Sequence, residues 1–298
     1  NDATDVWAAR HGNYLSHAAQ PFRSASIDHI QCGKLDCDRD GGEFPGANLG
    51  LYSVTYLNDL ERDKRTLEAF HAFREEAERK RFRYFLEVFD PNIESGIPPE
   101  KLGEFINDQI LRTLAGIAEA GRPDFLKIVY HGPRLMEEIC QYDPNLIVGV
   151  LGGSAGTTYD AFRLLHDAKK HGARVALFGR KINNAEHQLA FIEFLRLIAE
   201  DTIGPEEAVH AYHGVLQGKG ITPKLSLEQD LELTEQSMRY SDTGGSPSVT
   251  IRNNPLAKSK TRPPQPDAAW PTKPSGAPDF ASMSADQRLA YHTARLRQ

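Results

Sequence analysis

The sequence predicts an α/β protein built as a (β/α)8 barrel, on three observations. From residue 49 onward, short apolar runs typical of strands alternate with stretches that have helical spacing. The predicted strands are apolar along most of their length, which indicates a parallel sheet covered by helices. The connections are short and no Gly-x-Gly-x-x-Gly motif follows the first strand, so a barrel fits better than a dinucleotide-binding sheet.

The predicted strands are rich in β-branched and aromatic residues, which fit a pleated sheet. They span residues 49–57, 84–89, 125–130, 146–151 and 174–178. A weaker strand-like run covers residues 26–30. Because a barrel needs eight strands, we expect the first strands either within the opening region or upstream of Asn1.

The stretches between the strands have the periodicity of amphipathic helices. In the first of them, Phe70 and Phe73 belong to one apolar face and charged residues occupy the rest. Gly121 and Gly172 each supply a helix stop. The predicted helices span residues 59–80, 99–121, 133–142, 157–171, 184–200 and 205–217.

Changes in composition divide the chain into three regions. Residues 1–48 are irregular and polar and could belong to the barrel, which occupies residues 49–240. Residues 241–298 form a polar, Pro-rich tail that cannot bury enough apolar surface to fold alone. We expect this extended tail, with a short terminal helix at 284–291, to lie on its own barrel or on a neighbouring subunit of a homo-oligomer. The alternative is a tail without fixed contacts.

Composition excludes several classes of protein. The chain has 35 Lys and Arg against 41 Asp and Glu, a net charge of −6, which argues against a general nucleic-acid binder. No apolar run approaches the ~20 residues of a membrane span, and the polar start does not resemble a signal peptide. Three cysteines are too few for a disulfide scaffold, so we expect reduced thiols and a cytoplasmic location.

Two charged residues interrupt the apolar strands. Lys127 and Glu87 each lie among apolar neighbours, so both side chains should point into the barrel lumen. Burial lowers the pKa of a lysine, and a neutral amine can form a Schiff base with a ketone. Glu87 could then act as general acid and base. The alternative is a structural ion pair between the two residues, and both interpretations put them in one site.

Small residues at the ends of the last two strands suggest an anion site. Gly152, Gly153 and Ser154 follow one strand and precede a helix, where backbone N–H groups and the helix dipole favour an anion. Gly179 and Arg180 end the next strand. Barrels often bind phosphate with these loops, so the pairing favours a phosphate site over an ordinary tight turn.

Other polar motifs carry weaker signals. Tyr130 and His131 follow the lysine strand and are candidates for lining the pocket. The run from Asp36 begins like a calcium loop, but its twelfth position is Ala47 rather than Glu, so no such site is expected. His210 and His213 have no third ligand nearby in the sequence. We therefore expect neither a metal nor a cofactor.

Taken with their spacing, these motifs resemble a known family. Residues 49–218 resemble the class I aldolases of the deoxyribose-phosphate, tagatose-bisphosphate and archaeal-type fructose-bisphosphate group. The strand with Glu87 is similar to the acid/base strand of tagatose-bisphosphate aldolase, and residues 126–130 look like the Schiff-base lysine strand. The segment from Gly152 to Arg180 resembles the two phosphate-binding strands of the family and is the most specific match.

The chain also departs from the family pattern. The family lysine is on strand six, whereas only two or three predicted strands precede Lys127, which implies that the first strands lie outside the chain or are degenerate. The first-strand Asp of the family has no match. Archaeal-type aldolases have a Tyr that acts as the catalytic acid near this position, whereas this chain has Phe89. The resemblance therefore assigns the acid/base role to Glu87.

The resemblance implies a lyase that cleaves or forms a phosphorylated ketose through a Schiff base on Lys127. The iminium would serve as the electron sink, so neither metal nor cofactor is implied. The main alternative is a catalytically inactive barrel that acts as a structural or assembly component. A third interpretation keeps the Schiff base but changes the reaction to that of a transaldolase or dehydratase.

Overall fold

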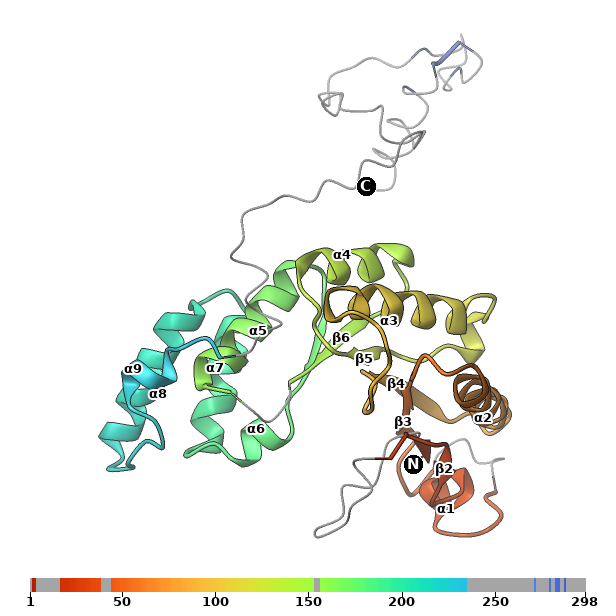
Figure 1. Ribbon diagram of the computed structural model, residues 1–298, viewed down its shortest axis with the longest axis horizontal. Coiled ribbons are helices and arrows are strands. Elements are labelled where there is room, and N and C mark those ends of the chain that lie inside the picture. The colour runs from red at the N-terminus through yellow and green to blue at the C-terminus, as the bar shows by residue number, and fades with distance from the viewer. Residues whose placement is uncertain are drawn as a thin grey trace. The chain divides into compact units, whose positions relative to one another are not determined.

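The computed structural model describes residues 2–3, 17–38, 44–152, 156–234, 271, 279, 282–284 and 287. The chain divides into two compact units, Asn1–Gly245 and Ser246–Gln298. The labelled helices and strands of Figure 1 all belong to the first unit. The expected tail helix at 284–291 lies mostly outside the described residues.

The first unit contains a largely parallel sheet, which confirms the predicted α/β class. Its order is β2-β1-β3-β4-β5-β6-β7, and every neighbouring pair is parallel except β1 with β2. The strands are β1 (Asp2–Ala3), β2 (Phe22–Arg23), β3 (Leu49–Thr55), β4 (Arg83–Phe89), β5 (Leu126–Ile128), β6 (Val148–Leu151) and β7 (Val175–Leu177).

Helices separate the parallel strands as the apolar spacing predicts. They are α1 (Ile27–Cys32), α2 (Leu60–Arg79), α3 (Pro99–Leu114), the 3-10 turn η2 (Glu119–Gly121), α4 (Pro133–Tyr142), α5 (Thr158–Lys170), α6 (Arg180–Asn183), α7 (Gln188–Ala199), α8 (Pro205–Gly218) and α9 (Leu227–Asp230). From β3 to β7 each strand pairs with the next one along the chain. At β1 the order changes direction, because β1 lies between β2 and β3.

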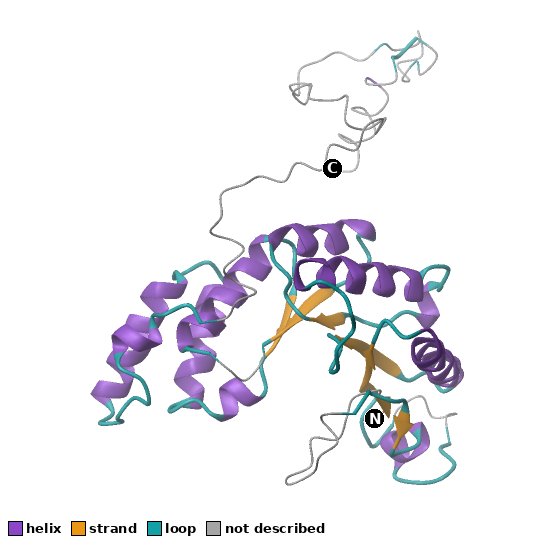
Figure 2. Cartoon of the chain, viewed as in Figure 1, coloured by secondary structure: helices purple, strands orange, loops and turns teal. Residues whose placement is uncertain are grey.

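Helices α2 to α5 cover one face of this sheet (Figures 1 and 2). The β3 residue Tyr52 and the β4 residue Tyr84 contact Phe70 and Phe73 of α2, with ring centroids 4.5 to 6.1 Å apart. Successive strand residues alternate between faces, so Glu87 lies on the opposite face from Tyr84. Among the described strands β2 and β7 are the two edges, and the sheet is not closed by them.

A second apolar core lies beyond the sheet. Helices α5, α7 and α8 pack together around Phe162, Phe191, Phe194 and Tyr212. Tyr212 meets Phe191 and Phe194 in edge-to-face contacts, a favourable geometry for aromatic rings. Among the described residues, no helix combines the length and the apolar character that a membrane span requires.

Two sequence-based expectations about local structure are wrong. The run at 26–30 is not a strand but part of α1, because Ser26 accepts a hydrogen bond from the His29 N–H and Gly33 ends the helix with a φ of 68°. The helix expected to reach Gly121 ends at Leu114, since Ala115 is extended and Gly116 has a φ of 77°. Capping and glycine conformations decide both outcomes.

The expectation of three reduced thiols is also wrong. Cys32 and Cys37 form a disulfide, and Cys140 is the free cysteine among the described residues. Burial, the largest effect, raises the pKa of the Cys140 thiol to about 11, and the nearby Glu137 carboxylate acts in the same direction. A thiol in such surroundings is mostly protonated and weakly reactive at neutral pH.

We therefore predict slow, strongly pH-dependent alkylation of Cys140 in the oxidised protein. With a pKa of about 11, only about one thiol in a thousand is a thiolate at pH 8. The rate of iodoacetamide labelling should rise about tenfold per pH unit between pH 8 and 10. Mass spectrometry of timed samples measures it, with an unstructured cysteine peptide as control. A rate that levels off near pH 8.5, as for a free peptide thiol, contradicts the prediction.

Candidate functional site

The candidate site is centred on an ion pair between two neighbouring strands. Glu87 of β4 is aligned in register with Lys127 of β5. The Lys127 Nζ lies 2.5 Å from Glu87 Oε1, and the two side chains are 21% and 5% exposed. The sequence-based expectation that these residues share one site therefore agrees with their geometry.

The surrounding strand residues hold this pair on the face away from the helices. Leu86 and Val88 flank Glu87 and are buried in the core. Leu126 and Ile128 flank Lys127 and are buried in the same core. Because side chains alternate along a strand, burying these neighbours against the helices forces both charged groups to the other face.

Residues on the adjacent strands complete a row across the sheet. Ser53 of β3 is aligned with Glu87, and Gly149 of β6 is aligned with Lys127. A Cβ at Gly149 would lie 2.7 Å from the Leu126 carbonyl oxygen and 3.0 Å from Val175 Cβ. Gly149 therefore permits close strand packing and leaves space beside the lysine. Sequence analysis missed Ser53 and Gly149, although their place in the strand pattern could have indicated them.

A cavity of about 1050 Å³ opens beside Lys127. Its walls are mainly apolar and come from β6, β7, α5 and α7, with Leu177, Leu195 and Gly179 among the lining residues. The charged residues that line it are all cations: Lys127, Lys169, Arg174 and Arg196. Three of these cations form ion pairs with carboxylates outside the lining: Lys127 with Glu87, Lys169 with Asp201 and Arg196 with Glu193.

Of the five residues expected to bind phosphate, three are described. Gly153 and Ser154 lie outside the described residues. Gly152 gives room to an aromatic ring, since a Cβ there would lie 2.0 Å from Phe178 Cδ1. Gly179 lines the cavity with Lys127, whereas Arg180 begins α6 and is exposed. The structure thus brings Gly179 to the cavity beside Lys127, with Gly152 behind the Phe178 ring.

Carboxylates from the chain itself occupy the start of α5. The Thr157 N–H donates to Asp160 at 2.7 Å, and the Thr158 N–H donates to Asp230 at 2.6 Å. Asp230 also contacts His213 Nε2 at 2.9 Å. These contacts satisfy donors that the sequence analysis had left for a phosphate.

Lys181 is a cation that the sequence analysis missed. Its Nζ donates to the Gly156 carbonyl oxygen at 2.6 Å, in the loop between β6 and α5. Burial lowers the pKa of Lys181, while Asp230, Asp160 and Glu186 act in the opposite direction. Its neighbour Arg180 was the expected cation, and only the fold distinguishes the two.

Tyr130 and His131 do not line the cavity beside Lys127. Tyr130 is 2% exposed within the main core, and burial raises the pKa of its hydroxyl. Its hydroxyl has no hydrogen-bond partner among the described residues. His131 packs against Gly103 of α3, and its Nε2 contacts Asp90 Oδ1 at 2.9 Å.

The residues that the structure describes contain no group of three His, Cys, Asp or Glu side chains able to hold a metal ion. His213, one of the two histidines noted in the sequence, instead contacts Asp230. At the ion pair itself, an amine next to a carboxyl group can perform proton transfer and nucleophilic addition.

No protein-family model and no curated relative matches the chain. Several solved structures are similar, among them two aldolase structures. The first, from a study of a Schiff-base-forming fructose-1,6-bisphosphate aldolase, has a TM-score of 0.41 and 19% identity over 53% of this chain and 59% of its own length. The second, an archaeal fructose 1,6-bisphosphate aldolase, has a TM-score of 0.41 and 18% identity over 52% and 58%. The chain thus spans less than two thirds of either structure, and a likeness this weak carries no argument about activity.

The buried hydroxyl of Tyr130 gives a stability prediction. Tyr130→Phe removes a polar group that has no partner among the described residues, so the free energy of unfolding should rise by about 1 kcal/mol. Urea denaturation of both proteins measures the change. Tyr84→Phe is the control and should be destabilising, because the Tyr84 hydroxyl donates to the Gly121 carbonyl oxygen at 2.8 Å. If Tyr130→Phe instead lowers the free energy of unfolding, the Tyr130 hydroxyl forms a hydrogen bond in the folded protein and the prediction is wrong.

Proposed function

We propose that the chain is a class I aldolase-type lyase that acts on a phosphorylated ketose through a Schiff base on Lys127. The observation that carries this proposal is the buried Lys127–Glu87 pair beside the 1050 Å³ cavity. An amine at 2.5 Å from a carboxylate has its proton acceptor in place, and the cavity gives a ketone access to the amine.

Schiff-base formation needs two proton transfers that Glu87 can perform. The Lys127 ammonium first gives a proton to Glu87, and the neutral amine attacks the substrate carbonyl carbon. One proton passes from the carbinolamine nitrogen to its oxygen, and Glu87, now protonated, donates a second proton to that oxygen, which leaves as water. The product is an iminium cation next to a carboxylate, which stabilises the positive charge.

The same carboxylate serves in bond cleavage. Glu87 takes the proton from the C4 hydroxyl, the C3–C4 bond breaks, and its electron pair moves into the iminium to form an enamine. An aldehyde leaves, and protonation of C3 followed by hydrolysis returns the free Lys127 amine. The sequence of steps balances without a metal, because the iminium accepts the electrons.

We assign the substrate phosphate to Gly152, Gly153, Ser154, Gly179 and Arg180, with Lys181 as an additional cation. Arg174, the lining cation that does not pair with Glu87, Asp201 or Glu193, supports an anionic substrate. The contact of Lys181 Nζ with Gly156 supports a role for this lysine at the same loop. Tyr130 is left out of the binding site because its hydroxyl lies in the core, and His131 is left out because it packs on α3.

We also propose that β3 to β7 are part of a (β/α)8 barrel wall. Their sequential order and the helices on one face support a barrel. The cavity beside Lys127 extends along β7, an edge of the described sheet. Closure requires further strands between β2 and β7, and these would convert the open face into a lumen.

A structural role is the competing function, and the same ion pair supports it. A buried pair can exist solely to neutralise two charges, and removing one partner then costs about 3 kcal/mol of stability. Such a barrel would serve as an assembly component without turnover. Chemical trapping separates the two functions because it reports on nucleophilicity rather than on stability.

We predict that borohydride reduction in the presence of ketose phosphates or dihydroxyacetone phosphate leaves an adduct on the Lys127 peptide. Mass spectrometry of the digested protein locates it. Lys127→Met should abolish the adduct, whereas Lys169→Met, which removes another lysine of the same cavity, should keep it. Glu87→Gln should slow trapping by about a hundredfold, the usual loss for a general acid/base.

The trapping result has a clear contrary outcome. If no ligand labels Lys127 while a known class I aldolase is labelled in parallel, the Schiff-base function is wrong and the structural role stands. If the adduct forms but no free ketone fragment is released from any ketose phosphate, a transaldolase or dehydratase reaction replaces the lyase.

We propose further that the protein is a homo-oligomer in which the tail, residues 241–298, contacts a neighbouring subunit. Its Pro-rich, polar composition supports this, because such a segment lacks a core of its own. A chain truncated after residue 240 should form a smaller particle by light scattering. An unchanged number of subunits per particle would exclude the tail as an assembly arm.

A further inference from the structure

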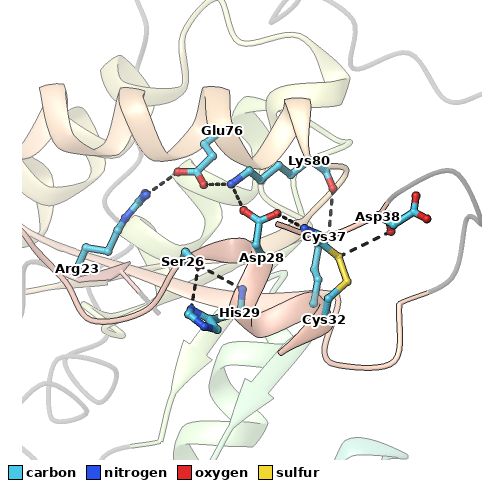
Figure 3. Close-up of polar contacts among 10 residues, drawn as sticks. Arg23, Ser26, Asp28, His29, Cys32, Cys37, Asp38, Glu76 and Lys80 are labelled. Atoms are coloured by element: carbon cyan, nitrogen blue, oxygen red, sulfur yellow. Dashed lines mark hydrogen bonds and ion pairs between the residues drawn. A yellow bond between two sulfur atoms is a disulfide. The ribbon is translucent and has the colours of Figure 1, made fainter. Parts of the chain in front are cut away.

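The Cys32–Cys37 disulfide links the end of α1 to the loop that follows it (Figure 3). Cys32 is the last residue of α1 and is half-buried, and Cys37 is 8% exposed. The four residues between them are all exposed. Cys32 is therefore the more accessible of the two cysteines.

The backbone of Cys37 connects this disulfide to a buried carboxylate. The Cys37 N–H donates to Asp28 Oδ1 at 3.1 Å, and the Asp28 side chain is 8% exposed. Asp28 also forms an ion pair with Lys80, the residue that ends α2. The position of Cys37 thus determines one of the groups that hold the Asp28 charge in the interior.

The network continues from Lys80 across α2 to the sheet. Lys80 Nζ contacts Glu76 at 2.5 Å, and Glu76 contacts Arg23 of β2 at 2.5 Å. Figure 3 shows the chain of contacts running from the disulfide through Asp28 and Lys80 to Arg23. Through these hydrogen bonds and ion pairs, the disulfide is linked to residues of α1, α2 and β2.

A second set of contacts attaches α1 to the same end of α2. Gln31 is fully buried, and its Nε2 donates to the Lys80 carbonyl oxygen at 3.1 Å and to Asn48 Oδ1 at 2.8 Å. Gly46 approaches α1 closely, since a Cβ there would lie 2.3 Å from the Ile30 carbonyl oxygen. The end of α1 therefore contacts the turn from α2 into β4 and the segment that precedes β3.

We propose that Cys32–Cys37 is a redox-active modification site, and that its reduction by a dithiol loosens the attachment of α1 to the C-terminal end of α2. The disulfide closes a short loop, with a sequence separation of 5 residues. A loop this short removes little entropy from the unfolded chain. Its main effect is local, because it holds the Cys37 N–H against Asp28.

The exchange proceeds in two balanced steps. A thiolate of the dithiol attacks the Cys32 sulfur, a mixed disulfide forms, and the Cys37 sulfur leaves as a thiolate that takes up a proton. The second thiol of the reagent then attacks the first sulfur of the same reagent, which is bonded to Cys32 in the mixed disulfide. This attack releases the Cys32 thiol. Two electrons and two protons pass to the protein, and the reagent becomes a cyclic disulfide.

Reduction removes the covalent constraint on residues 33–37. The Cys37 N–H can then leave Asp28, and the charge of Asp28 depends more heavily on Lys80. The contacts of Gln31 to Asn48 and Lys80 lose the rigid helix end that positions them. Strands β4 to β6 take no part in these contacts, so we expect a local change in protection without loss of the sheet.

The test compares the full chain before and after reduction with dithiothreitol, by hydrogen exchange and mass spectrometry. On reduction, amide exchange in residues 27–37 and 80–82 should accelerate about tenfold, while β4 to β6 keep their protection. Cys32→Ser should show the faster exchange without reductant and no further response. Cys140→Ser, which leaves the disulfide intact, should behave as the wild type.

Two results overturn the proposal. In the first, thiol counting shows that Cys32 and Cys37 are reduced, but exchange is the same in both states, so the disulfide has no effect on α1. In the second, Cys32 and Cys37 stay oxidised in the folded chain at dithiothreitol concentrations that reduce a cystine peptide. Comparing the two states of the wild-type protein keeps the test valid even if Cys32→Ser does not fold.

Discussion

The alternation of side chains along β4 and β5 is the constraint on which the rest of the structure depends. Each strand sends its aliphatic residues into the helix-covered core, so Glu87 and Lys127, which lie between those residues, must point the other way. Parallel pairing in register then brings Glu87 opposite Lys127. Neither charge would be tolerated at this burial alone, and their contact makes both acceptable.

The space around the ion pair follows from small residues on the neighbouring strands. Gly149 removes a side chain from the row, and Gly152 lets the Phe178 ring approach β6. The cavity beside Lys127 is bounded on its far side by α7, which belongs to the second apolar core with α5 and α8. Residues of both apolar cores line this cavity, among them Val150 of the first core and Leu195 of the second.

In two places, groups of the chain itself bind partners that the sequence analysis had left free. At the start of α5, Asp160 and Asp230 bind N–H groups that would otherwise be available to an anion. Near the N-terminus, a disulfide and the Asp28–Lys80 ion pair hold α1 in place, although three cysteines in the sequence had indicated free thiols. In each case the sequence does not show which residues pair, and the pairs form only when the chain folds.

The sequence by itself determined the order and type of strands β3 to β7 and of helices α2 to α5, α7 and α8. It also determined the common face of Glu87 and Lys127, because periodicities of 2 and 3.6 residues are local properties of the chain. Tertiary structure alone decided that Lys181 rather than Arg180 contacts the loop after β6. It also decided that Tyr130 turns into the core and that residues 26–30 begin a helix. These outcomes depend on where separate elements pack and how helix ends are capped, and neither is contained in the spacing of apolar residues.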